Sequence, residues 1–164
     1  GRPTTHGCPS RRFLYSNRPS HSDIWLADPA ADTLRTLTGE AADGMQHQHP
    51  VWSADGRRLA YLRGPLGAGQ IVVRDVARGV EISVEMPPTW DQEAPTNVLT
   101  TLTWAPGTVI LAAVQTPAGT AVWRLDPDGG LPSLLLDQAA WSLQPVWSPD
   151  GGRIALFSDH EGGP

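Results

Sequence analysis

Hydrophobic and polar positions alternate along this chain in short runs, and each run ends at a turn rich in glycine, proline or aspartate. Apolar runs that end in aspartate lie at residues 23–28, 70–75 and 121–126. Each is followed by a turn and a further alternating run, at 33–38, 80–85 and 133–137. A period of two residues is typical of β-strands, whose successive side chains point to opposite faces. The pattern therefore predicts an all-β chain of short strands joined by tight turns.

A longer pattern repeats over these runs. The segment Pro50–Tyr61 (PVWSADGRRLAY) returns as Pro145–Leu156 (PVWSPDGGRIAL), with a degraded copy that begins at Trp104 and a partial copy at Arg11–Tyr15. Each signature supplies two strands joined by a turn, and the runs that follow it supply two more. A unit of four short strands, about 45 residues long, predicts a blade of a β-propeller.

The repeat makes residues 1–164 one domain of blades, each with four antiparallel strands. We expect blade 1 over about 6–38, blade 2 over about 49–85, blade 3 over about 101–137 and half of blade 4 over about 144–164. A closed ring needs about four to eight blades. About three and a half blades therefore predict a partial propeller, and the remaining blades of the same ring are its first expected partners.

The signature Pro-x-Trp-Ser-x-Asp-Gly-x-x-Ile/Leu-Ala, with a later Ile-Trp or Val-Trp strand that ends in aspartate, resembles the WD-like repeat of TolB-like bacterial β-propellers. The resemblance covers nearly the whole chain. It implies a segment of a six-bladed ring and a periplasmic or otherwise extracytoplasmic location. Because one fold serves many functions, the resemblance does not choose among them.

Charge and composition narrow the classes of partner. The net charge is −5 and the 12 basic residues are scattered, so the sequence has no basic stripe for nucleic acid. No apolar run approaches the roughly 18 residues of a membrane span. The sequence also contains no Gly-x-Ser-x-Gly elbow, zinc-binding helix motif or phosphate-binding glycine loop. We therefore expect no catalytic residue, no cofactor and no enzymatic activity in this segment.

Propeller topology assigns the connections between strands to two faces. The loops between blades share one face with the loops between second and third strands, and they are long and irregular. Loops of this kind on a rigid scaffold often carry binding residues, and His21 is a candidate there. The hairpins on the opposite face are short and repeated, which is typical of structural turns.

The tryptophans divide according to the repeat. Trp52, Trp104 and Trp147 hold one repeat position, so we expect them to pack between adjacent blades. Trp90 and Trp141 lie outside the repeat, in connections on the loop face. An aromatic residue in such a connection covers a core edge or meets a partner, and we treat both as candidate partner contacts.

The most specific chemical feature is the pair His47 and His49, directly before an inner strand. In an extended segment the two side chains share one side, and His49 matches Thr101 and Gln144 in register, at the mouth of the central channel. Histidines two residues apart can form half of a metal site. TolB-like pectin-oligomer lyases hold manganese with histidines and a glutamine, but here the neighbouring blades supply only a threonine and a glutamine. We therefore expect no metal and a hydrogen-bonded polar lining.

The leading hypothesis is a non-catalytic binding or scaffold module that contacts a protein or peptide partner through its loop face and channel mouth. The main alternative is the gating propeller of a prolyl-oligopeptidase-like serine peptidase. A metal-dependent lyase of pectin oligomers is the third hypothesis.

Overall fold

The computed structural model describes residues 22–38, 45–64, 69–87, 98–107, 109–138 and 142–158. These residues form strands and turns, and none of them forms a helix long and apolar enough to cross a membrane. In chain order the strands are β1 (Trp25–Asp28), β2 (Thr33–Thr36), β3 (Gln46–Trp52), β4 (Arg58–Gly64), β5 (Gln70–Asp75), β6 (Glu81–Ser83), β7 (Val98–Trp104), β8 (Ile110–Thr116), β9 (Gly119–Leu125), β10 (Ser133–Gln138), β11 (Ser142–Trp147) and β12 (Ile154–Ser158).

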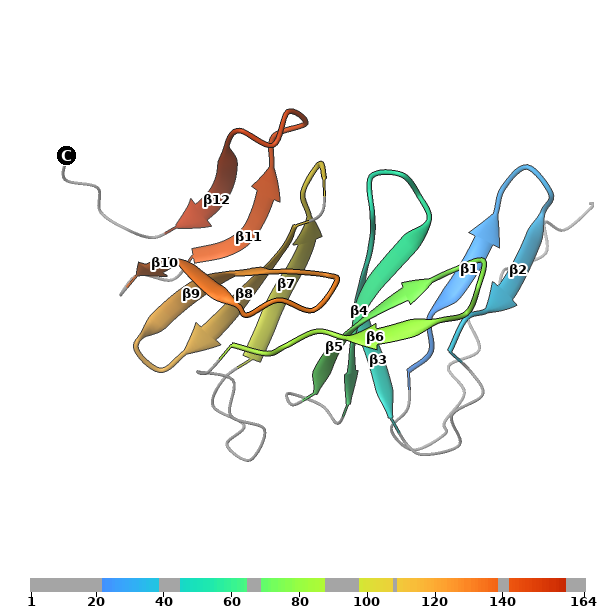
Figure 1. Cartoon of the computed structure of the whole chain (residues 1–164), viewed down its shortest axis with the longest axis horizontal. Helices are drawn as coiled ribbons and strands as arrows, with labels where there is room; N and C mark the ends of the chain where they lie inside the picture. Colours follow the sequence, from blue (N-terminus) through green and yellow to red (C-terminus); the bar gives the residue numbers. More distant parts are fainter. Residues whose placement is uncertain are drawn as a thin grey trace, which may run out of the picture.

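The strands form separate antiparallel sheets in which neighbours in space are neighbours in sequence. Two sheets have four strands, β3-β4-β5-β6 and β7-β8-β9-β10, and two have two strands, β1-β2 and β11-β12. Figure 1 shows these sheets side by side in chain order, with β1–β2 (blue) at one end and β11–β12 (red) at the other. This arrangement confirms the all-β partial propeller that the sequence predicts.

The inner strands begin earlier than the expected blade boundaries at 49, 101 and 144. Strand β3 starts at Gln46, β7 at Val98 and β11 at Ser142, two or three residues ahead. The difference arises because each inner strand contains a register shift. The strand continues past that shift, but the alternation of side chains does not. The expected first half of blade 1 lies outside the described residues, which include only its last two strands.

Apolar clusters fill the seams between blades. The central strands of blade 2 are buried on both faces, so their sequences are almost continuously apolar. In β4, Leu59 and Tyr61 pack toward β1–β2, whereas Ala60 and Leu62 pack toward blade 3. The seam between blades 2 and 3 is the largest of these clusters, and a third lies between blade 3 and β11–β12. Stability therefore comes mainly from contacts between neighbouring blades.

The repeated tryptophans differ in burial. Trp104 is 7% exposed and packs in the seam between blades 2 and 3, and Trp147 is half-buried against blade 3. Trp52 is 46% exposed. By the repeat, its seam neighbours are expected from the first half of blade 1, outside the described residues. Seam packing thus holds for Trp104 and Trp147, while Trp52 keeps a large exposed surface.

The hairpins of blades 2 and 4 have the same construction. In both, the serine hydroxyl accepts a hydrogen bond from the backbone N–H five residues later, Arg58 N to Ser53 Oγ and Arg153 N to Ser148 Oγ, each at 2.9 Å. The glycine of each turn has a positive φ, 68° at Gly56 and 71° at Gly151, which disfavours other residues. The Ser-x-Asp-Gly signature is therefore a turn motif.

Candidate functional site

Of the residues predicted for the channel mouth, all but His47 lie at one level on three neighbouring inner strands. Strand β7 contacts both β3 and β11. Trp52, Trp104 and Trp147 each pair with the first residues of the following strand, which fixes a common register. Counting back from these tryptophans places His49, Thr101 and Gln144 at equivalent positions of β3, β7 and β11.

Two of these positions have an unusual backbone. His49 has φ of 54° and Gln144 has φ of 56°, and each precedes a proline. Residues before proline favour extended conformations, and non-glycine residues at positive φ are uncommon. The register shifts of β3 and β11 fall at these same residues, whereas that of β7 lies between Leu99 and Thr101. A bulge redirects a side chain from the regular face of a strand, and here it does so at equivalent places in blades 2 and 4.

The three side chains differ in exposure. His49 and Thr101 are half-buried, and Gln144 is exposed. Burial lowers the pKa of His49 below its ordinary value, so the ring is neutral at pH 7. A neutral imidazole has one donor and one acceptor nitrogen, threonine has a hydroxyl, and glutamine has an amide. The three positions therefore offer hydrogen-bond donors and acceptors without net charge.

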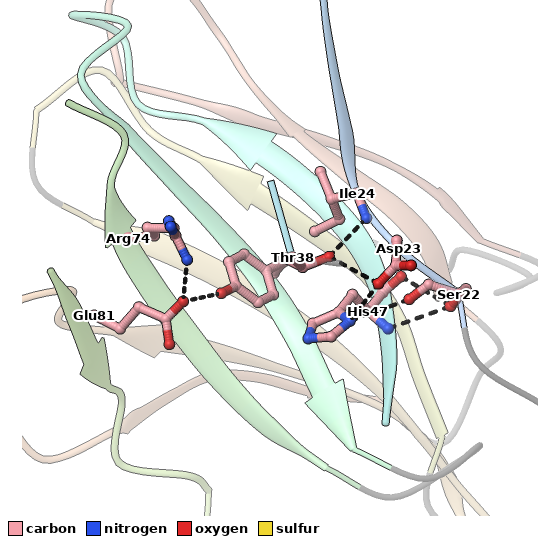
Figure 2. A network of polar contacts seen from close by, with 8 residues as sticks. Ser22, Asp23, Ile24, Thr38, His47, Arg74 and Glu81 are labelled. Carbon is pink, nitrogen blue, oxygen red and sulfur yellow. Dashed lines mark hydrogen bonds and ion pairs between the residues drawn. The ribbon is translucent and has the colours of Figure 1, made fainter. Parts of the chain in front are cut away.

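His47 lies in a different environment, shown in Figure 2, and is only 6% exposed. Its Nδ1 donates a hydrogen bond of 3.1 Å to the carbonyl oxygen of Ser22 and lies 3.7 Å from Oδ1 of Asp23. The backbone N–H of His47 also donates to the Ser22 carbonyl at 2.9 Å. The hydroxyl of Thr38 donates to Oδ1 of Asp23 at 3.3 Å and accepts from the N–H of Ile24 at 2.9 Å. These contacts connect β3 to Ser22 and Asp23 before β1 and, through Asp23, to Thr38 after β2.

The other predicted contacts cannot be placed. His21, Trp90 and Trp141 lie outside the described residues, and their roles stay predictions. Among the residues that the structure does describe, no three histidine, cysteine, aspartate or glutamate side chains form a group that could hold a metal ion.

Similarity to known proteins is found at the level of structure and not of sequence. The sequence matches no family model, and no curated protein matches it significantly. Solved structures do match. TolB from Acinetobacter baumannii has a TM-score of 0.64 at 19% identity, over 86% of this chain and 33% of that chain. A putative TolB from Agrobacterium tumefaciens has a TM-score of 0.64 at 23% identity, over 88% of this chain and 49% of that chain. The fold is a TolB-like β-propeller.

This TolB-like propeller segment spans about a third of the first structure's length and about half of the second's. Dipeptidyl peptidase 4 from Porphyromonas gingivalis is also similar, with a TM-score of 0.51 at 15% identity, over 68% of this chain and 22% of that chain. At identities of 15–23%, these structural similarities show the fold alone.

Sequence reasoning missed the surroundings of His47 in the TolB-like propeller. Ser22 and Asp23 approach it from the preceding blade, 25 residues away in the case of Ser22. The sequence contained a signal for these surroundings, because His47 is polar where the equivalent residue of blade 3, Leu99, is apolar. Polar residues that depart from the repeat in adjacent blades are candidates for contact with one another.

Proposed function

We propose that this TolB-like propeller segment is a non-catalytic binding module whose channel mouth contacts a protein or peptide partner. The observation that supports it is the placement of His49, Thr101 and Gln144 at one level of three neighbouring inner strands. In this proposal His21, Trp90 and Trp141 on the loop face extend the contact. His47 is a positioning residue, because its hydrogen bonds to Ser22 hold the strand that carries His49.

The chemistry of the channel mouth favours a peptide over a charged small molecule. A neutral histidine, a threonine and a glutamine can each donate to and accept from peptide groups. A bulge also leaves backbone groups of the inner strand outside the regular ladder, where they can pair with an extended segment. Selection of 12-residue peptides from a random library against the wild-type protein supplies a defined probe for this surface.

We expect the double change His49→Asn and Gln144→Asn to weaken binding of such a selected peptide about tenfold or more, as measured by fluorescence anisotropy. Asparagine tolerates positive φ, so it shortens both side chains without adding backbone strain. The melting temperature should stay unchanged. Arg153→Ala, on an exposed hairpin of the opposite face, is the control and should leave affinity unaltered. Equal loss in the control, or no loss in the double variant, would reject the channel mouth as the site.

The second candidate function is a gating propeller of a serine peptidase. The similarity to dipeptidyl peptidase 4 supports it, since a propeller channel can restrict which peptides enter a hydrolase domain. The full-length gene distinguishes the candidates, because a Gly-x-Ser-x-Gly motif with downstream aspartate and histidine would identify the hydrolase. Similarity to TolB supports an extracytoplasmic location, which fractionation of the source bacterium tests.

We further propose that additional blades of the same repeat pack on the two outer faces of the segment, on blade 1 and on β12. At one end Trp25 is 55% exposed, although Trp123 at the same repeat position is buried in a seam. At the other end Phe157 is 70% exposed, although its equivalent in blade 2, Leu62, is buried in a seam. Both faces therefore repeat the residues of an interior seam, and no blade among the described residues packs on either of them.

A second copy of this chain can serve as the neighbouring blade in a test. We expect the segment to associate in sedimentation velocity between about 1 and 100 µM, and Phe157→Glu to abolish the association. Leu131→Glu places the same charge at an exposed residue of the β9–β10 turn and should leave association intact. A wild-type protein that stays monomeric throughout this range would contradict the interpretation of these faces as seam surfaces.

A further inference from the structure

A cavity of about 530 Å³ opens on the hairpin face, between blades 1 and 2. Three arginines line it, Arg35 from β2, Arg57 from the β3–β4 hairpin and Arg78 from the β5–β6 hairpin. Its volume is within the range of small-ligand sites. We call it the arginine pocket, after these three residues. It lies on the face whose short turns the sequence indicates to be structural, opposite the loop face.

The positive charge of the arginine pocket is only partly balanced. Within the described residues, no hydrogen bond or ion pair engages the guanidinium of Arg35 or Arg57. Asp75 also lines the pocket, with Oδ2 at 4.0 Å from Nε of Arg78. Its Oδ1 already accepts hydrogen bonds from two backbone N–H groups of its own turn, of Ala77 at 3.1 Å and of Arg78 at 2.9 Å. Asp75 is the one carboxylate among the described lining residues, and Asp55 attracts Arg57 from outside the lining.

The blade repeat does not account for Arg35 or Arg78. The equivalent of Arg35 in blade 2 is Ile82, as the strand pairing shows. Aligning the turns places Gly152 at the position of Arg57 and Gly129 at that of Arg78. By contrast Arg58, next to the pocket, is repeated as Arg153, and it has a structural partner in Asp128 at 2.6 Å. Arg35 and Arg78 thus lie outside the repeat, whereas Arg57 recurs in the partial copy as Arg11. The meeting of these three guanidinium groups at one cavity supports a ligand site.

We infer that the arginine pocket binds an acidic peptide segment of a partner protein. The planar guanidinium groups of Arg35 and Arg57 match the two oxygens of Asp or Glu side chains, in pairs that are shorter and stronger than neutral hydrogen bonds. Val76 and Ala77 give the pocket an apolar wall for the aliphatic part of such a segment. Asp75 places a like charge in the lining, and this charge repels a compact multiply charged anion such as phosphate more strongly than a single carboxylate.

Fluorescence anisotropy with a labelled peptide of alternating glutamate and leucine tests this inference. We expect the peptide to bind the wild-type protein and its glutamine–leucine counterpart not to bind. The double change Arg35→Gln and Arg57→Gln should weaken binding about tenfold or more. Neither guanidinium makes a hydrogen bond or ion pair among the described residues, and Arg57 only attracts the exposed Asp55 at longer range, so the melting temperature should change little. The control Arg124→Gln with Arg153→Gln removes the same charge from exposed positions outside the pocket and should alter affinity less than about twofold.

Three results would overturn the inference. Equal losses in the two double variants would show that the overall charge of the protein, and not this pocket, attracts the peptide. Binding of the glutamine–leucine peptide with similar affinity would remove the role of the carboxylates. Failure of the acidic peptide, together with saturable binding of inorganic phosphate that the Arg35 and Arg57 changes abolish, would assign the pocket to phosphate. Each result leaves the channel-mouth proposal untouched, because its variants and its peptide are different.

Discussion

Replacing Trp104 with alanine is expected to lower the free energy of unfolding by about 3–5 kcal/mol. The side chain is 7% exposed and packs against blade 2 in the largest apolar cluster. The guanidinium carbon of Arg58 lies 5.2 Å from the ring centre, which adds a cation–π contact. The buried indole nitrogen has no hydrogen-bond partner in the described part of the chain, so Trp104 stabilises the fold through contacts of its ring. Urea unfolding followed by far-UV circular dichroism measures the loss without depending on tryptophan fluorescence.

Two variants complete this test. Trp25→Ala removes the same side chain from an exposed outer face, so its cost should stay within about 0.5 kcal/mol. Trp104→Phe retains an aromatic ring and should cost about 1–2 kcal/mol, which keeps the test informative if the alanine variant does not fold. Similar losses for Trp104 and Trp25 would contradict the conclusion that seams between blades stabilise this fold.

The repeat predicted the fold well because its residues have local roles. The turn built from Ser53, Asp55 and Gly56 is closed by hydrogen bonds within a few residues, so its sequence is sufficient to identify it. Apolar runs such as Ile71–Val73 identify central strands because both of their faces are covered. Four strands in each unit then follow from the spacing of the turns.

Features that depend on neighbouring blades could not be obtained in this way. The bulges at His49 and Gln144 add a residue to a strand without changing its composition, so the alternation could not reveal their positive φ. The burial of His47 requires Ser22 from the preceding blade. The arginine pocket joins Arg35, which lies outside the repeated pattern, to Arg57 across a seam. Polar departures from a repeat become informative only when the contacts between units are known.

Replacing Tyr61 with alanine is the second change with a large expected effect, a loss of about 3–5 kcal/mol in the free energy of unfolding. The side chain is fully buried in the seam between blades 1 and 2, and its ring meets that of His47 edge-on at 5.7 Å between centroids. Its hydroxyl donates a hydrogen bond of 2.7 Å to Oε1 of Glu81. Burial, followed by this contact, raises the pKa of Tyr61 above its ordinary value, so the hydroxyl remains a donor throughout the neutral range.

Tyr61→Phe separates the ring from the hydroxyl. Burial opposes ionisation of Glu81, but hydrogen bonds from Tyr61 and Arg74 and the charges of Arg63 and Arg74 together lower its pKa. The carboxylate keeps both arginines, each at 2.7 Å, when the hydroxyl is removed. Because Glu81 is partly exposed, water can replace the lost donor, and the cost should be about 1 kcal/mol.

Phe157→Ala is the aromatic control on the outer face of β12 and should cost far less than Tyr61→Ala, since its ring is 70% exposed. Urea unfolding by circular dichroism compares the three variants under one condition. If Tyr61→Phe cost as much as Tyr61→Ala, the polar contact with Glu81 would dominate the stability of this seam, and ring packing would be secondary. A smaller loss for Tyr61→Ala than for Phe157→Ala would instead mean that blade 1 does not stabilise blade 2, although β1 and β2 cover its apolar face.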